Sequence, residues 1–296
     1  MSSSHTRSAT GGRRSRLGTH RRNELRAISA DVVLDFRGRL QRSGVGDPTI
    51  VKALTVLQSI MSFAVLKGRI DANPVDRVKK PSQHADRQVP PVAPALVERM
   101  RAGMVLRDAT LVSLLAYAGV RPQEAFALYC EDVGERSLRI RAKVVDGVRL
   151  PYTKTRRNRS VRLLAPLAQD VREYMLATGR RTGLLFPRAD GQPWRKHDWR
   201  NWHRRVYRPA AEKVGLDAAR PYDLRGSFVS LLAWEGEPMA IIAKNAGHSI
   251  ATAERHYLKI FEDFDPANRT SAEKAIRAAR EPGVSGVQAL FETGRS

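Results

Sequence analysis

The feature that most constrains this fold is a proline-rich stretch at residues 81–94, PSQHADRQVPPVAP. It holds four prolines in fourteen positions and has no hydrophobic period. Proline removes a backbone donor and fixes φ, so neither a helix interior nor a central strand crosses such a stretch. We therefore predict a linker between two domains, a small one over residues 23–80 and a larger one over residues 95–265.

Both ends of the chain are predicted to be tails. Residues 1–22 consist largely of Ser, Gly and Arg, with too little apolar surface to offset the entropy of ordering, so we predict disorder. Their arginines favour a basic arm that follows phosphates over a tail that only improves solubility. Residues 266–296 form a C-terminal tail with one candidate helix at residues 271–280.

Residues 23–80 have the pattern of a small all-helical unit. Ser29 is a suitable N-cap for a helix that runs to Leu40. Thr49 is a suitable N-cap for a second helix, which carries a broad apolar stripe and ends at Gly68. We expect two or three helices that share a thin core.

The larger domain is predicted to combine many helices with one small antiparallel sheet, so the chain as a whole is mainly α. Three alternating apolar runs predict a three-stranded antiparallel sheet, and Asp146-Gly147 between the first two runs is a strong hairpin signal. The strands are expected at residues 137–144, 148–155 and 160–164. Helices are expected at residues 95–104, 106–117, 122–130, 165–178, 197–214, 221–234, 239–245 and 251–261.

The charge of the chain indicates its partner. The formal net charge is +22 at pH 7 and the sequence pI is about 11. Such an excess predicts an anionic polymer, with nucleic acid first and an anionic membrane second. The basic residues are spread along the chain, which weighs against a membrane. We see no apolar run near the roughly 20 residues of a membrane span and no secretory signal, so we expect a cytoplasmic protein with no membrane partner.

Five separated residues suit the chemistry of a phosphodiester: Arg121, Lys154, Arg225, His248 and Tyr257. Cleavage builds negative charge on the non-bridging oxygens, and two guanidinium groups neutralise it. The lysine can protonate the leaving oxygen, the histidine can hydrogen-bond the phosphate, and the tyrosine can attack it. We predict no metal site and no cofactor, because this chemistry needs none and the single cysteine excludes a cysteine-rich zinc site. Proline at residue 122 also predicts that Arg121 sits at a helix N-terminus, where backbone N–H groups favour anions.

Taken singly, each of these residues has an ordinary explanation as a surface charge, a helix cap or a packing residue. Their order along the chain resembles that of the tyrosine recombinase (phage integrase) family. The resemblance covers residues 25–265 and rests on AYAGVRPQEAFAL, TKTRRNRSVRL, YDLRGSF, AGHSIATAERHYLK and the helical segment TIVKALTVLQSIMSFAVLKGRIDANPV.

This resemblance implies a site-specific DNA recombinase, of bacterial or phage origin and carried by a mobile genetic element. It would cleave and rejoin DNA strands through a covalent 3′-phosphotyrosine, without metal or ATP. Residues 23–80 would be its core-binding domain and residues 95–265 its catalytic domain, closing around double-stranded DNA. A homotetramer on paired DNA sites is also implied, with residues 271–280 as a candidate helix for exchange between subunits. A DNA-bending accessory protein is left open, and location at the nucleoid is expected.

The resemblance also assigns roles within the site. Tyr257 would be the nucleophile, and the other four residues of the set would activate the phosphate. Glu124 and Asp223 would orient the two arginines. Tyr222 stands three positions before Arg225, where the family usually has histidine. A phenol can donate a hydrogen bond to a phosphate oxygen but titrates far above neutral pH, so we expect Tyr222 to bind rather than to shuttle protons.

Two further readings remain open at this point. The same fold could serve a relaxing enzyme like the type IB topoisomerases, or a DNA-binding remnant with impaired cleavage. A basic architectural protein without catalysis would explain the charge but would leave the ordered motifs as coincidence. The N-terminus also lacks a recognisable arm-site-binding domain, which family members sometimes carry.

Overall fold

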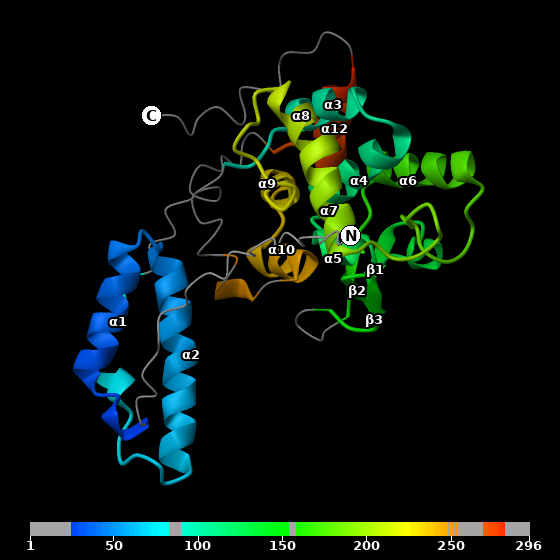
Figure 1. Ribbon diagram of the computed structural model, residues 1–296. Helices are drawn as coiled ribbons and strands as arrows, with labels where there is room; N and C mark the ends of the chain where they lie inside the picture. The colour runs from blue at the N-terminus through cyan, green and yellow to red at the C-terminus, as the bar shows by residue number, and fades with distance from the viewer. Residues whose placement is uncertain are drawn as a thin grey trace, which may run out of the picture. The chain divides into compact units, whose positions relative to one another are not determined.

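The computed structural model describes residues 25–82, 90–153, 158–247, 249–251, 253 and 269–281. The chain divides into two compact units, Met1–Gln88 and Val89–Ser296, and the division falls inside the proline-rich stretch. Figure 1 shows the smaller unit in blue and cyan and the larger one in green to red. Each unit has a hydrophobic core of its own.

The smaller unit is helical, as predicted. It contains the 3₁₀ turns η1 (Leu25–Ala27) and η2 (Pro74–Arg77) and the helices α1 (Ala30–Arg42) and α2 (Asp47–Leu66). Ser29 caps α1 by accepting a hydrogen bond from the backbone N–H of Val32 at 3.4 Å, which confirms the predicted start. The predicted N-cap of the second helix was wrong. The helix begins after Gly46 rather than Thr49, because Pro48 is compatible with its first turn.

Helix α2 presents apolar residues on two faces. Ile50, Leu54 and Met61 are buried in the core of the unit, whereas a second face that includes Phe63 is exposed. By length and composition this helix could cross a membrane, with a mean hydropathy of 1.7, so our expectation that no segment has that character was wrong. A single such helix is weak evidence of a span, since the core helices of other proteins pass the same test.

The larger unit has many helices and a few short strands, which confirms the predicted mainly α class with a small amount of antiparallel sheet. Its elements in chain order are α3 (Pro94–Ala102), α4 (Leu106–Tyr117), α5 (Pro122–Ala125), η3 (Cys130–Asp132), β1 (Ser137–Ile140), β2 (Lys143–Val145), β3 (Val148–Leu150), β4 (Arg159–Arg162), α6 (Ala165–Thr178), α7 (Lys196–Trp202), the π-helical turn η4 (His203–Tyr207), α8 (Arg208–Glu212), α9 (Arg225–Glu235), α10 (Met239–Ala246) and α12 (Ala272–Arg280).

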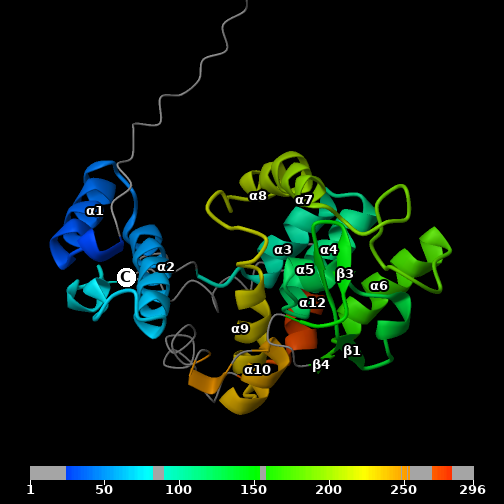
Figure 2. The same ribbon diagram turned by 60° about the horizontal axis from the view of Figure 1, so that its bottom comes forward.

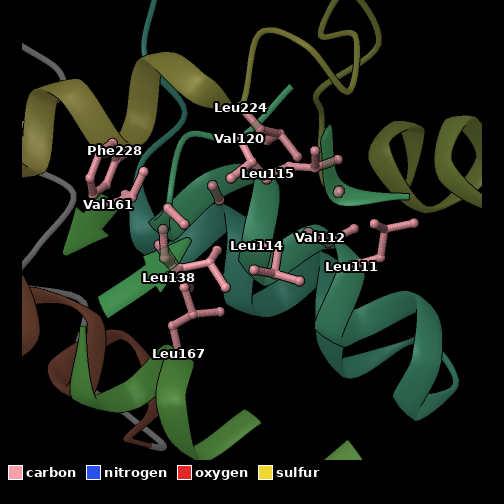
Figure 3. Close-up of a cluster of buried hydrophobic side chains, with 14 of the residues drawn as sticks. Leu111, Val112, Leu114, Leu115, Val120, Leu138, Val161, Leu167, Leu224 and Phe228 are labelled. Carbon is pink, nitrogen blue, oxygen red and sulfur yellow. The ribbon is translucent and has the colours of Figure 1, made fainter. Parts of the chain in front are cut away.

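Helix α4 is the centre of the larger unit. Every residue from Asp108 to Tyr117 is buried. Leu114 and Leu115 lie in a cluster with Leu167 of α6 and Phe228 of α9 (Figure 3). Figure 2 shows α9 and α10 on one side of α4 and the helices α7 and α8 on the other. Because α4 is buried among them, it fixes the positions of the N-termini of α5 and α9, which carry Arg121 and Arg225.

The predicted three-stranded sheet is wrong. The structure has two separate two-stranded antiparallel sheets, β1 with β4 and β2 with β3. The run 137–144 breaks between Ile140 and Lys143, and β1 pairs with β4 so that Leu138 lies opposite Val161, both fully buried. The hairpin at Asp146-Gly147 is confirmed, because both residues have positive φ (46° and 83°) between β2 and β3.

Two predicted helices flanking the site are shorter than expected. The helix at 122–130 is a single turn, α5, and the chain then bends into η3. The helix expected from Pro221 begins only at Arg225, because the carboxylate of Asp223 accepts a hydrogen bond from the backbone N–H of Arg220 at 2.7 Å and closes a turn there. Most of the helix predicted at 251–261 lies outside the described residues.

Helix α12 confirms the helix predicted at 271–280. It packs against α3, α6 and α9 of its own unit, with Ala272, Ala275 and Ile276 buried. Arg280 anchors its end, with Nη2 at 2.7 Å from a carboxylate oxygen of Asp170. In this single chain the candidate exchange helix is therefore docked on its own larger unit.

Candidate active site

Arg121 is held by two elements that are far apart in the sequence. It is the N-cap of α5, and its backbone N–H donates to Glu124 Oε2 at 2.9 Å. Its guanidinium donates from Nη1 to Glu124 Oε1 at 2.8 Å and from Nη2 to the carbonyl oxygen of Gly247 at 3.1 Å. Because α5 is one turn long and Glu124 accepts this N–H, the charged side chain rather than the helix end is the group that can bind an anion here.

Glu124 is the carboxylate at the centre of the site, with 2% of its side chain exposed. Arg159 donates to it from two nitrogens, Nη1 to Oε1 at 3.0 Å and Nη2 to Oε2 at 2.7 Å. Burial alone would raise the pKa of Glu124, but the hydrogen bonds and charge of Arg159, with the charge of Arg121, lower it to about 2. Glu124 is therefore ionised and fixed between two guanidinium groups.

Arg225 is the first residue of α9 and is 1% exposed. Its guanidinium donates a hydrogen bond to the carbonyl oxygen of Gly119, in the turn that follows α4. Burial, together with the positive charges of Arg121 and Arg159, lowers the pKa of Arg225 to about 10. It therefore stays charged at neutral pH, close enough to the other two arginines to sense their charge.

Gly119 shows why α4 and α9 can meet at this point. Its φ is +56°, and a Cβ atom there would lie 2.6 Å from Cδ1 of Phe228. Only glycine adopts this backbone conformation at so close an approach. The close packing brings the Gly119 carbonyl to Arg225.

Tyr222 is half exposed, in the turn before α9. Burial alone would lower the pKa of Arg121, but the charge of Glu124 and hydrogen bonds to Glu124 and Tyr222 raise it. The phenol thus contacts the guanidinium of Arg121. The backbone carbonyl of Tyr222 accepts from the N–H of Arg225 at 3.3 Å, so this residue links the two arginines.

The structure brings together some of the predicted site residues and leaves others undescribed. Arg121, Glu124, Arg225 and Tyr222 form one cluster, and Asp223 closes the turn beside them. Lys154, His248 and Tyr257 lie outside the described residues. Gly247 directly precedes His248 in the sequence and ends α10 with a left-handed φ of +63°, a conformation that favours glycine.

Arg159 was not among the site residues that the sequence predicted. It opens strand β4, and it stands two residues before Val161, which is fully buried. Side chains two apart on a strand point to the same face, so this spacing was a usable signal that Arg159 points inward. Among 52 basic residues it was not a conspicuous one.

The electrostatic character of the cluster follows from its composition. Three guanidinium groups gather around one carboxylate, which leaves an excess of positive charge in a largely buried place. Guanidinium groups suit phosphate oxygens because each can donate two parallel hydrogen bonds. Within the described part of the chain, no group of three His, Cys, Asp or Glu residues could hold a metal ion.

The amino-acid sequence of this chain is similar to those of known proteins. Residues 92–263 match the model of the Phage integrase family. The chain is 27% identical over 247 residues to tyrosine recombinase XerD of Corynebacterium glutamicum, covering 78% of this chain and 74% of that protein. It is 25% identical over 275 residues to tyrosine recombinase XerC of Roseiflexus castenholzii, covering 89% and 83%.

Solved structures share the fold. The Tn1549 transposon integrase in complex with a circular intermediate DNA superposes with a TM-score of 0.67 at 16% identity, covering 79% of this chain and 82% of that one. A λ integrase dimer bound to a COC′ core site gives a TM-score of 0.61 at 11% identity, covering 79% and 81%. The XerH recombinase bound to a palindromic difH substrate gives 0.62 at 16% identity, covering 80% and 71%.

Proposed function

Because the chain belongs to the phage integrase family, we propose that Tyr257 attacks a DNA phosphate that Arg121 and Arg225 hold. The chain is a tyrosine-type site-specific recombinase, an enzyme that breaks and rejoins DNA. The proposal concerns which residues of this chain carry out the reaction and how they share it.

The observation that carries the proposal is the burial of Arg225 beside Arg121. Placing charged groups of one sign together inside a protein is unfavourable unless a counter-charge compensates them. Glu124 supplies one negative charge to three guanidinium groups, and a bound phosphodiester would supply a second negative charge. Both arginines are also held by backbone carbonyls, at Gly247 and Gly119, so their positions are set before DNA arrives.

The reaction assigned to the site is a transfer of the phosphodiester between two hydroxyl groups. The phenol of Tyr257 releases its proton to solvent, and its oxygen forms a bond to phosphorus while the bond to the 5′ oxygen of the next nucleotide breaks. Lys154 donates a proton to that leaving oxygen, and His248 hydrogen-bonds the phosphate. The products are a 3′-phosphotyrosine and a free 5′-hydroxyl. A 5′-hydroxyl can then attack the phosphotyrosine in the reverse reaction, which rejoins a strand without ATP.

Tyr222 and Glu124 support this reaction in different ways. Tyr222 contacts Arg121 and is half exposed, so its hydroxyl is available to a phosphate oxygen beside that arginine. Glu124 aligns Arg121 through two hydrogen bonds, one to its backbone N–H and one to its guanidinium. Asp223 shapes the turn that delivers Arg225.

The assembly is also part of the proposal. We assign DNA binding on the core site to the helical unit around α1 and α2, and catalysis to the larger unit. Exchange between two DNA sites would use four copies of the chain, as paired cleavage of two duplexes requires four nucleophiles. Cytoplasmic location at the nucleoid follows from the same role.

A covalent-adduct gel tests the proposal. The full chain is mixed with nicked duplexes tiled from the DNA that flanks its own gene, quenched with SDS and compared with Tyr257→Phe. We expect a slow-moving protein–DNA band that disappears in the variant. A band that persists in Tyr257→Phe places the nucleophile elsewhere. Efficient relaxation of supercoiled plasmids without any such site indicates a relaxing enzyme instead.

A further inference from the structure

We propose that Arg159 is a positioning residue of the cleavage reaction, which sets Arg121 through Glu124 and the C-terminal end of α10. The inference rests on the proposed function, because it assigns to Arg121 a phosphate that must be held in one place. It adds to that function a residue with no phosphate contact of its own.

The contacts of Arg159 show that it acts through other residues. Nη1 and Nη2 donate to the two oxygens of Glu124, and Nε donates to the carbonyl oxygen of Asn245 at 3.2 Å. All three nitrogens thus have a protein partner, and 7% of the side chain is exposed. These contacts use three of its five N–H donors, and burial leaves the other two little access to DNA.

Glu124 transmits the position of Arg159 to Arg121. Oε1 accepts from Nη1 of both arginines, at 3.0 Å from Arg159 and 2.8 Å from Arg121. Oε2 accepts from Arg159 Nη2 at 2.7 Å and from the backbone N–H of Arg121 at 2.9 Å. A carboxylate with four such bonds has one orientation, and removing two of them frees it to rotate.

A second route runs through the end of α10. Arg159 binds the carbonyl of Asn245, while Arg121 binds the carbonyl of Gly247 two residues later. A Cβ atom at Gly247 would lie 3.0 Å from Cζ and Nε of Arg159, so the backbone at Gly247 packs closely against this side chain. The segment that leads into His248 is therefore supported by the same side chain that fixes Glu124.

Arg162 provides a matched control on the same strand. It donates to both oxygens of Glu235, at 2.6 and 3.1 Å, and its backbone N–H donates to the side chain of Asn245 at 2.9 Å. It therefore resembles Arg159 in residue type, strand and ion pairing. Its carboxylate partner Glu235, however, is not among the residues that contact Arg121 in the described part of the chain.

The test measures cleavage and binding separately, on a duplex that gives the Tyr257-dependent adduct. In single-turnover reactions at saturating protein, we expect Arg159→Gln to lower the cleavage rate by about 100-fold, because a small misplacement costs about that much. Its dissociation constant for the duplex should change by less than about 3-fold, since no phosphate contact is lost. Arg162→Gln should cleave within about 3-fold of the wild-type rate.

Two further variants separate positioning from folding. Arg159→Lys keeps the charge but cannot bridge both oxygens of Glu124, so we expect about a 10-fold loss of rate with a nearly unchanged unfolding midpoint. Adding Arg159→Gln to Glu124→Gln should slow cleavage by less than Arg159→Gln slows the wild type, because the part of its effect that passes through Glu124 is already lost.

The outcomes distinguish the two proposals. Wild-type cleavage by Arg159→Lys, or losses that multiply in the double variant, would overturn the role of Arg159 while leaving Tyr257 as the nucleophile. An adduct that persists in Tyr257→Phe would overturn the proposed function itself. A larger loss of DNA affinity than of cleavage rate in Arg159→Gln would make it a DNA contact and also contradict the inference.

Discussion

Replacing Glu124 by glutamine removes the one carboxylate of the cluster and keeps its shape. In the structure this carboxylate accepts two hydrogen bonds from Arg159 and two from Arg121. The variant therefore leaves two guanidinium groups, of which Arg159 is nearly buried, without their counter-charge. Removing one partner of a buried ion pair is among the more damaging single changes, because the remaining charge is left uncompensated.

The magnitude follows from the pKa of Glu124. A fall from 4.5 to about 2 corresponds, at about 1.36 kcal/mol per unit, to about 3 kcal/mol of stability at pH 7. The folded state has the lower pKa, so this stability is present above pH 4.5 and is lost as the pH falls towards 2. The difference between the wild type and Glu124→Gln should shrink to about 2 kcal/mol at pH 3.5.

Urea unfolding followed by tryptophan fluorescence measures this difference. All four tryptophans, at positions 194, 199, 202 and 234, lie in the larger unit, so the signal reports on the unit that contains Glu124. Glu235→Gln is the control, because Glu235 pairs with the partly exposed Arg162 and should cost about 1 kcal/mol or less. A difference for Glu124→Gln that is below 1 kcal/mol, or that stays constant between pH 3.5 and 7, would refute the reasoning.

Three other predictions follow from the same geometry. Gly119→Ala should destabilise the larger unit by more than about 2 kcal/mol in the same assay, because its Cβ would overlap Phe228. Gly183→Ala is the control and should cost about 1 kcal/mol, because Gly183 has a φ of +77° but open space around it. Equal costs for the two variants would contradict the packing argument. Tyr222→Phe should slow single-turnover cleavage by about 10-fold through loss of its hydroxyl, and Tyr222→His should not; unchanged cleavage by Tyr222→Phe would remove Tyr222 from the site. DNA affinity measured by titration should fall with salt at about −0.9 per phosphate neutralised in a log–log plot, and a flat plot would contradict a basic clamp.

The helices and the order of the site residues were predictable because their signals are local. A period of 3.6 residues places α4 and α6 at 106–117 and 165–178 in both the prediction and the structure. The helix predicted at 239–245 ends within one residue of α10, because a glycine that can adopt the left-handed conformation, here Gly247, is a local stop signal. Arg121 and Arg225 could be selected as candidates because each stands in a short motif of the family.

The sheet and the two shortened helices were not predictable in the same way. Strand β1 could pair with either neighbouring run, and its pairing with β4 buries Leu138 against Val161. Nothing in the alternation of one strand identifies its partner, since every run offers the same period of two. The late start of α9 depends on a hydrogen bond from the backbone N–H of Arg220 to the Asp223 carboxylate, which competes locally with the helix.

By itself, the sequence determined the mainly helical class, the break near residue 88, the basic character and the family to which the chain belongs. Only the tertiary structure decided that Arg159 lies beneath the site, that Glu124 accepts from two arginines, and that α12 docks on its own unit. The physical reason is range. Helix periods, caps and turns depend on residues within a few positions, whereas Arg159 meets Glu124 across 35 positions and Asn245 across 86. Such contacts depend on how the whole chain packs, so the sequence alone could not distinguish Arg159 from the other arginines.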